Sequence, residues 1–235
     1  MVEKARQKAL DYGHSLPNFI CTQETRRDTA KVTKENQPTK WKLSDTLTIQ
    51  LGYFEQKENY HVVAIDGKPT SKPIGKVGGH TALGDFGSNL NSVFDPKSQT
   101  NFRWDSWETM NGRATAVFSF TIDRSHSTFM TWVTTFLKTK RTNWAVKGQV
   151  VLDAETLDIL CLTFESVDIP DDFPIRATQT KIEYSYQTVG GKDYLLPRHS
   201  MNTTTFADGR IARADTTFSD YKKFTADAGI VFDPP

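Results

Sequence analysis

Residue types that bind metal ions or act in acid–base catalysis are present in this sequence, but not at the spacings that such sites use. Metalloenzyme motifs such as HExxH, or paired cysteines and histidines, do not occur. Asp168, Asp171 and Asp172 could suggest a cation site, yet turns rich in Asp and Pro are common without a metal. The sequence therefore predicts no metal site and no cofactor. The five histidines lie far apart along the chain, at His14, His61, His80, His126 and His199.

Nucleophilic catalysis is not indicated either, because the sequence has no GxSxG motif. One of the two cysteines, Cys161, lies between two leucines, and apolar surroundings raise a thiol's pKa and lower its reactivity. With Cys21 as the other, two buried free thiols are favoured over a single bridge, which an oxidising compartment would still allow. An enzyme stays an alternative only if the fold gathers polar residues that are distant in sequence. The candidates are His61, His80, Asp85 and Glu108.

One short stretch breaks the strand-like pattern of the chain. Its apolar residues recur at spacings of three and four, which predicts a helix over 84–95 that ends before Pro96. These residues are Phe86, Leu90, Val93 and Phe94. The glycines around its start could cradle an anion, but a sharp backbone turn before the helix is the favoured interpretation. They are Gly78, Gly79, Gly84 and Gly87.

Most of the remaining chain alternates between apolar and polar residues, as half-buried strands do. A helix is expected over 2–15, and Asn111-Gly112 is a strong hairpin signal because both residues tolerate a positive φ. About ten strands should form a meander over 18–233, with the helix 84–95 inserted, in one domain spanning 1–235. The expected strands include 18–27, 60–65, 101–110, 113–123, 128–138, 144–152, 157–167, 175–189, 192–206 and 210–224, together with one beginning at Trp41.

These elements predict an α+β fold that is mainly β. The expected architecture is a curved antiparallel sheet, or half-barrel, with the N-terminal helix and a short central helix on its concave side. A formal net charge of +1 argues against a nucleic-acid partner, and no apolar run is long enough for a transmembrane helix. The first residues lack the apolar core of a signal peptide. The protein is therefore expected to be periplasmic if a signal preceded this sequence, and cytoplasmic otherwise.

Aromatic and apolar residues concentrate in four successive strands between residues 101 and 152. Several of these strands have apolar residues at both odd and even positions, so apolar side chains lie on both faces of the strand and both faces must be shielded from water. One interpretation is an ordinary core; the other is a cavity for an apolar ligand between the sheet and the central helix. Such a cavity would take a lipid or acyl chain more readily than a charged metabolite. The predicted ligand contacts are Phe86, Leu90, Val93, Phe94, Trp104, Phe118, Phe120, Met130 and Trp132.

Several segments resemble the envelope carrier fold of the LolA, LolB and RseB proteins. The order of an N-terminal helix, a strand meander and a helical insertion is similar, as are the segments Tyr60–Pro69, Val151–Leu160 and Gly190–Pro197. The pattern LPNFxCTQ, at Leu16–Gln23, is even more similar to envelope proteins of acidobacterial type. This resemblance implies a half-barrel with an apolar concave face, closed by short helices, that works in the periplasm without catalysis. LolA-like members carry acylated lipoproteins, and RseB-like members sense envelope stress.

Three functions follow as hypotheses. The first is a non-enzymatic periplasmic module that binds a lipid or other apolar ligand in the concavity of the sheet. The second is an envelope scaffold with a filled core that binds another envelope protein. The third is an enzyme whose site the residue spacing does not reveal.

Overall fold

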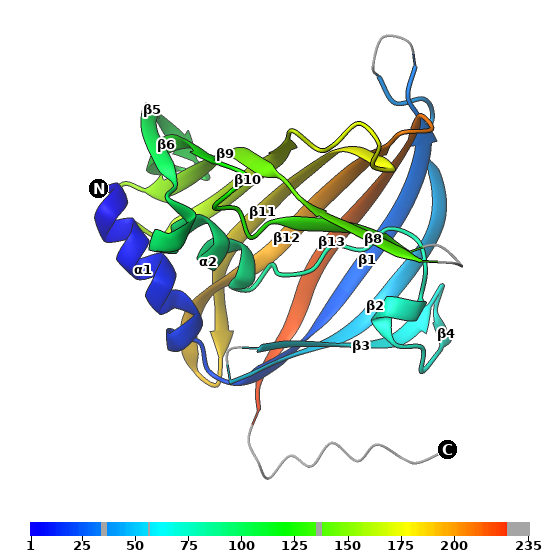
Figure 1. Ribbon diagram of the computed structural model, residues 1–235. Coiled ribbons are helices and arrows are strands. Elements are labelled where there is room, and N and C mark those ends of the chain that lie inside the picture. Colours follow the sequence, from blue (N-terminus) through cyan, green and yellow to red (C-terminus); the bar gives the residue numbers. More distant parts are fainter. Residues whose placement is uncertain (34–36, 56, 135–137, 225–235) are drawn as a thin grey trace.

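The computed structural model describes residues 1–33, 37–55, 57–134 and 138–224. Within these residues, eleven strands form one open antiparallel sheet that curves around a concave face (Figure 1). The expected fold class, mainly β with two helices, is confirmed. The elements are α1 (Val2–Ser15), β1 (Phe19–Lys31), β2 (Lys42–Phe54), β3 (Lys57–Ile65), β4 (Lys68–Pro69), η1 (Ile74–Lys76), α2 (Ser88–Phe94), η2 (Pro96–Ser98), β5 (Asn101–Met110), β6 (Arg113–Ile122), β7 (Met130–Thr134), β8 (Thr139–Asn143), β9 (Ala145–Asp153), β10 (Ile159–Val167), β11 (Ile175–Val189), β12 (Lys192–Phe206) and β13 (Arg210–Lys223).

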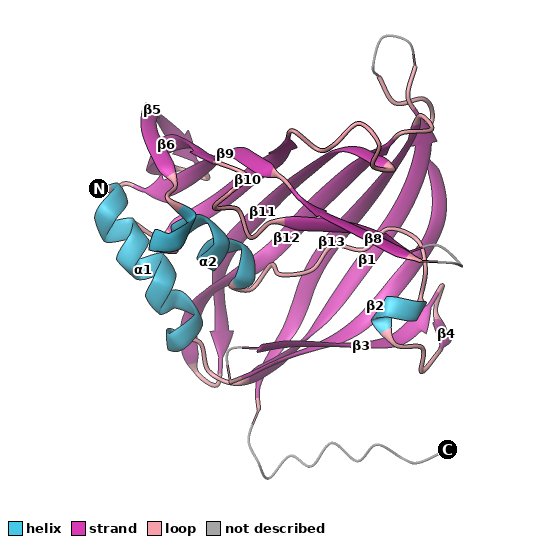
Figure 2. Cartoon of the chain, in the orientation of Figure 1, coloured by secondary structure: helices cyan, strands magenta, loops and turns pink. Residues whose placement is uncertain are grey.

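The order of strands across the sheet is β4-β3-β2-β1-β13-β12-β11-β10-β9-β6-β5. Neighbours in sequence mostly pair in space, as expected, but the first long strand, β1, also pairs with the last, β13. Strands β7 and β8 leave this order and form a separate two-stranded ribbon, which crosses in front of the sheet (Figure 2). Because β6 pairs directly with β9, the ribbon is an excursion over the concave side and not a break in the sheet.

The hairpin predicted at Asn111-Gly112 is confirmed. Both residues have positive φ angles, 51° and 78°, and Met110 pairs with Arg113 across the turn. A turn of type I′ needs this conformation at both central residues, and its twist matches that of the flanking strands. The local sequence therefore fixes the register of β5 and β6.

Both helices lie on the concave face of the sheet, where Ala5 and Ala9 of α1 share one core with α2. The central helix is shorter than the predicted 84–95, because Gly84 has a φ of +99° and residues 85–87 form turns. The helix ends where Asp95, the residue before a proline, adopts an extended ψ of 129°. In the part of the chain that the structure describes, no helix is long and apolar enough to span a membrane.

Some strand boundaries differ from the prediction. Strand β1 continues beyond the expected end at residue 27, because its polar residues beyond that point, including the buried Asp28, pair with Arg213 and its neighbours on β13. The expected strand 128–138 is only the short β7, and its residues 135–137 lie outside the described residues. Strand β8 was not predicted, since the sequence TKRTN has no apolar alternation. The predicted sheet limit of 233 also lies outside the described residues, and β13 ends at Lys223.

The concave face changes in character across the sheet. Strands β6, β9, β10 and β11 present apolar side chains, such as Phe120, Leu162 and Ile182, to α1 and α2. A second apolar cluster around Phe19 and Phe86 fills the end of the face below them. Between these clusters and the opposite end of β1, the sheet carries buried polar side chains instead. They include Gln23, Thr25, Arg27, Thr178, Thr180, Ser200, Thr204 and Thr216.

A candidate ligand cavity under the central loop

A cavity of about 350 Å³ lies on the concave side of the sheet. One wall is the segment 74–87, which we call the central loop; a second is strand β7, and the floor is formed by β10, β11 and β12. The cavity was expected between the sheet and the central helix. It lies instead beside α2, under the loop that precedes this helix and crosses the polar part of the sheet.

Arg27 holds the central loop to the sheet. Its side chain is buried and forms a bidentate ion pair with Asp45. Nε donates to Oδ1 at 2.6 Å, and Nη2 donates to Oδ2 at 2.5 Å. The remaining Nη1 donates to the carbonyl oxygen of Gly78 at 2.5 Å and, at 3.4 Å, to that of His80. Gly79 lies between them with a φ of +71°, and a Cβ atom there would come within 2.8 Å of Nη1. The glycine is therefore required for the loop to wrap around the guanidinium group.

A carboxylate on β3 holds the end of the loop that leads into α2. Glu58 accepts hydrogen bonds from the backbone N–H of Phe86 at 3.3 Å and from the hydroxyl of Ser88 at 3.5 Å. Tyr60 donates its hydroxyl hydrogen to Glu58 and accepts from the N–H of Gly84. Burial raises the pKa of Glu58, although these donors oppose that shift. The loop is thus anchored by Arg27 at residues 78–80 and by Glu58 at the end that leads into α2.

Asp85 is a buried carboxyl group at the edge of the cavity. Its Oδ2 accepts from the hydroxyl of Ser200 at 2.7 Å, and its Oδ1 accepts from the amide of Asn89 at 3.5 Å. The hydroxyl of Tyr184 donates to its backbone oxygen at 3.4 Å. Burial raises the pKa of Asp85 to about 6, the Ser200 hydrogen bond lowers it, and the charge of Glu58 adds to the increase. The group therefore changes charge close to neutral pH.

The floor of the cavity combines uncharged polar side chains with the apolar Phe164, Ile175 and Phe206. Thr178, Thr180 and Thr204 are buried there on neighbouring strands. Asn202 donates from its amide nitrogen to Thr180 Oγ1 at 2.6 Å, which leaves its oxygen to accept from His80 Nε2 at 2.5 Å. Burial lowers the pKa of His80, so the imidazole is neutral at physiological pH.

The opposite wall is apolar. Phe129 packs against Trp144 and Phe164, with ring centroids 5.4 Å and 4.8 Å apart, and Met130 and Trp132 continue this wall along β7. None of the described residues that line the cavity is Lys or Arg, and its ionisable groups are His80 and Asp85. The cavity therefore offers an apolar side, a hydroxyl- and amide-bearing side, and no cation to receive an anion.

The structure separates the nine predicted ligand contacts into two groups. Six belong to packed core: Leu90, Val93, Phe94, Phe118 and Phe120 lie in the cluster under α1 and α2, and Phe86 lies in the neighbouring cluster. The other three are about half exposed, at 52% for Trp104, 50% for Met130 and 49% for Trp132. Of all nine, Met130 and Trp132 line the cavity, whereas Trp104 lies on the edge strand β5. Ligand contact itself stays a prediction for every one of them.

The polar residues considered for an enzyme are only partly brought together. His80 and Asp85 both line the cavity, but they hydrogen-bond to Asn202 and Ser200. Glu108 is exposed on β5 and accepts from Ser106. His61 follows the inward-facing Tyr60 on β3, so strand alternation directs it to the other face. Within the described residues, no group of three or more possible ligands could hold a metal ion.

The polar floor was not predicted from the sequence. Thr178 and Thr180 alternate with polar residues on β11, and Asn202 and Thr204 do so on β12, so neither strand shows an apolar face at this point. A threonine-rich strand is normal at a surface. One feature of the sequence could have indicated the buried threonines. On β11 they lie an even number of residues before Ile182 and Tyr184, so they share the inward face of the strand with these two residues.

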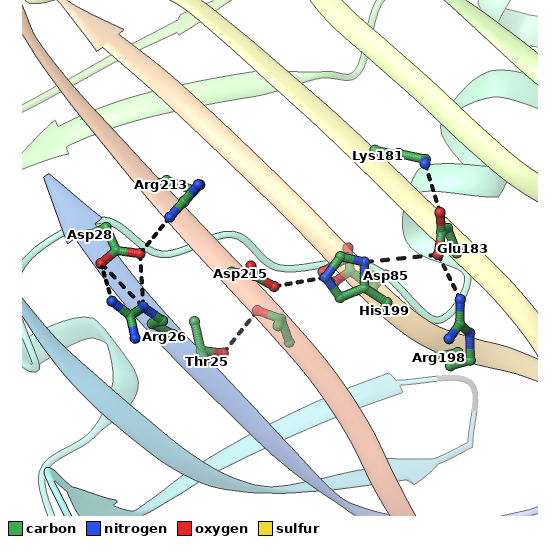
Figure 3. A network of polar contacts seen from close by, with 12 residues as sticks. Thr25, Arg26, Asp28, Asp85, Lys181, Glu183, Arg198, His199, Arg213 and Asp215 are labelled. Atoms are coloured by element: carbon green, nitrogen blue, oxygen red, sulfur yellow. Dashed lines mark hydrogen bonds and ion pairs between the residues drawn. The ribbon is translucent and has the colours of Figure 1, made fainter. Parts of the chain in front are cut away.

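The outer face of the sheet carries a network of charged pairs, shown in Figure 3. Glu183 contacts Lys181 at 2.6 Å and Arg198 at 2.8 Å, and His199 Nε2 lies 2.7 Å from Asp215. A larger, open hollow of about 730 Å³ crosses the same face over β5, β6 and β9–β12. Its charged side chains also pair with one another, as between Lys147 and Glu165 at 2.6 Å. These charged groups already pair with one another, so the cavity under the central loop is the better candidate site.

The two cysteines do not meet. Cys21 lies on β1 and Cys161 on β10, and both are free and buried. Burial raises the pKa of Cys21 to about 12 and that of Cys161 to about 11. The interpretation of two buried free thiols agrees with this arrangement.

Comparison with known proteins finds similarity in architecture only. No family model and no curated protein matches the sequence. The chain is similar to the crystal structure of a LolA superfamily protein from Nitrosomonas europaea, at 11% identity and a TM-score of 0.44 over 95% of this chain and 93% of that one. It is also similar to an outer membrane lipoprotein-sorting protein domain from Vibrio parahaemolyticus, at 12% identity and a TM-score of 0.41 over 96% and 92%. A DUF1329 family protein from Desulfovibrio piger follows, at 9% and 0.40 over 96% and 94%. The expected LolA-like arrangement agrees with these similarities, which say nothing of a ligand.

Proposed function

We propose that this chain is a non-enzymatic periplasmic module that binds a single amphiphilic lipid in the cavity under the central loop. The observation that carries the proposal is the pairing of an apolar wall with uncharged hydroxyl and amide groups on the floor of one partly open cavity of about 350 Å³. This volume lies at the lower end of the range of about 300–1,000 Å³ that is typical of ligand sites. The periplasmic location rests on the resemblance to the LolA-type carriers, not on the cavity.

The ligand we propose has an apolar body and an uncharged polar end. The apolar body would lie against Met130 and Trp132, and burial there contributes about 0.8 kcal/mol per methylene. The polar end would exchange hydrogen bonds with Thr180, Thr204 and Asn202 on the floor. A carboxylate is disfavoured at this end, because no lining cation would pair with it and Asp85, with a pKa of about 6, would repel it at neutral pH.

Calorimetric titration of delipidated protein tests this proposal with two probes of equal chain length, 1-decanol and decanoate, at pH 8. We expect saturable binding of one decanol per chain and a dissociation constant at least about tenfold higher for decanoate, a difference of about 1.4 kcal/mol. Trp132→Ala should weaken decanol binding. Trp107→Ala, which removes the same side chain from an exposed site outside the cavity, should not.

The outcomes separate the two parts of the proposal. If neither probe binds, the lipid-binding function is wrong. If decanoate binds as tightly as decanol, the function stands and the uncharged polar end is wrong. Equal losses in Trp132→Ala and Trp107→Ala would place the binding site elsewhere.

A further inference from the structure

Strand β5 forms an open edge of the sheet. It pairs with β6 on one side, and no described strand pairs with its other side. The strand is long for an edge, running over Asn101–Met110, and most of its residues are exposed or partly exposed. Natural proteins usually shorten or cover such edges, or interrupt them with charged residues and β-bulges, because their free N–H and C=O groups can pair with another chain. An uncovered edge of this length calls for an explanation.

Two tryptophans on this edge are among the most exposed large apolar residues of the described chain. Trp107 is 59% exposed and Trp104 is 52% exposed. Strand alternation would place residues three apart on opposite faces. A β-bulge between Trp104 and Ser106 changes this, so that Trp104 pairs with Phe118 and Trp107 with Ala116, both of which face the core. The bulge therefore sets both indole rings on the concave face of one edge.

The same bulge sets two opposite charges on the other face. Arg103 precedes Trp104 and Glu108 follows Trp107. The side chain of Arg103 is 81% exposed, and its guanidinium group lies 3.2 Å from the carboxylate of Asp105 in the same strand. The central sequence thus reads Arg-Trp-Asp-Ser-Trp-Glu, in which Arg103 and Glu108 flank the two tryptophans and Asp105 lies between them. If two such strands meet antiparallel about a two-fold axis between Asp105 and Ser106, every Arg103 lies opposite a Glu108. Each Trp104 then lies opposite a Trp107 on the same face.

We propose that two copies of this chain associate edge to edge through β5, so that their sheets join into one continuous sheet. The partner is a second copy because the edge is complementary to itself, in charge on one face and in aromatic surface on the other. A two-fold interface of this kind uses each contact twice. Opposite charges and aromatic pairs across neighbouring strands each stabilise a sheet by roughly 0.2–1 kcal/mol, in addition to the backbone hydrogen bonds.

Sedimentation equilibrium of the full chain, with charge-reversal variants, tests this association. We expect the wild type to form dimers with a dissociation constant in the micromolar range. Arg103→Glu and Glu108→Arg should each weaken the dimer at least about tenfold, since each places like charges opposite one another twice. The double variant R103E/E108R should restore dimerisation, because it exchanges the two charges. Arg210→Glu, an exposed arginine on β13, is the matched control and should leave the dimer unchanged.

The double variant makes the result decisive, since a fold damaged by either substitution would not be repaired by both. Circular dichroism should confirm that all four variants retain the wild-type spectrum. A wild type that stays monomeric up to millimolar concentration would overturn the proposal. A dimer that is insensitive to the single reversals, or that the double variant fails to restore, would show that another surface is used and would also overturn it.

Discussion

Two regions of the same concave face differ in packing. The side chains of α2 pack directly on the sheet, whereas a cavity separates the central loop from the sheet. Under α2, the side chains of Leu90, Val93 and Phe94 are directed toward the sheet by the helical period and pack on Phe118 and Phe120. The central loop has no such period. It is held by Arg27 at residues 78–80 and by Glu58 at the end that leads into α2. A helix fills the space below it, whereas a segment fixed at two points over short hydroxyl side chains leaves an opening. The comparison predicts that substitutions under α2 mainly lower stability, whereas substitutions that line the cavity mainly weaken ligand binding.

Truncation of the filled region should have the largest effect. Phe94 is 1% exposed and stacks on Phe102 at a centroid distance of 5.3 Å. Phe94→Ala should lower the free energy of unfolding by about 3–5 kcal/mol, through lost burial and the cavity left behind. Trp132→Ala removes a larger but half-exposed side chain and should cost less than about 1 kcal/mol. Urea denaturation measures both, and equal losses would mean that the two regions are packed alike.

The buried carboxyl group at the edge of the cavity should make stability depend on pH. Because the folded pKa of Asp85 is raised from 3.8 to about 6, the folded state binds its proton more tightly than the unfolded state. Its contribution is therefore fully present below pH 4 and is lost as the pH rises through 6, by at most about 3 kcal/mol. Asp85→Asn should match the wild type at pH 4 and become the more stable protein at pH 7.

A second carboxyl group provides the control for this dependence. The backbone N–H of Thr156 is the main cause that lowers the pKa of Asp153. Its contribution is present above the unfolded pKa and is lost as the pH falls, so Asp153→Asn should cost more stability at pH 7 than at pH 3. Denaturation curves of the two variants at several pH values should thus diverge in opposite directions. A parallel response would contradict the assignment of Asp85 as a destabilised carboxylate.

The polar anchoring of the loop can be tested through its glycines. Gly79→Ala should cost about 1–3 kcal/mol, because it combines a positive φ with a contact of 2.8 Å to Arg27. Gly78→Ala has the positive φ but open space, so it should cost less. Gly75→Ala has neither and should change stability by no more than about 0.5 kcal/mol. Thermal melts rank the three, and a cost for Gly79→Ala no greater than for Gly75→Ala would remove Arg27 as the anchor.

The smallest effect concerns access to the filled region. Cys21 lies in the apolar cluster with Phe19 and Phe86, and its thiol pKa is about 12. At pH 8 a thiol reagent should modify neither cysteine in the native protein and both after unfolding, since the thiolate is the reactive form. Rapid labelling of native Cys21 would mean that the reagent reaches this apolar cluster in the folded protein, and that the cluster is not tightly packed.

The fold was largely predictable because most strands carry their own signal. The hairpin at Asn111-Gly112, for example, sets the register of β5 and β6 locally. Local sequence patterns do not show which helix or loop, if any, covers a given face of the sheet. Trp104 faces inward like Phe118, yet it is exposed because no element lies over the edge strand.

The site was less predictable for a related physical reason. The helical period of residues 86–94 correctly indicated a buried face, but a buried face can be filled by the sheet as well as by a ligand. The polar floor depends on how β11 and β12 lie beneath the central loop, so Thr180 and Asn202 become neighbours only in three dimensions. Arg27 was placed at the end of a strand by its polar surroundings, and its role emerges only from its contacts with Asp45 and Gly78.

Fluorescence quenching by a brominated long-chain alcohol tests the central claim most directly, because bromine quenches only the indole rings that it approaches closely. Trp132 and Trp144 line the cavity, whereas the other three tryptophans, Trp41, Trp104 and Trp107, do not. A variant with those three changed to Phe should retain saturable quenching, and Trp132→Phe/Trp144→Phe should lose it. Quenching that persists in the second variant and vanishes in the first would contradict ligand binding under the central loop.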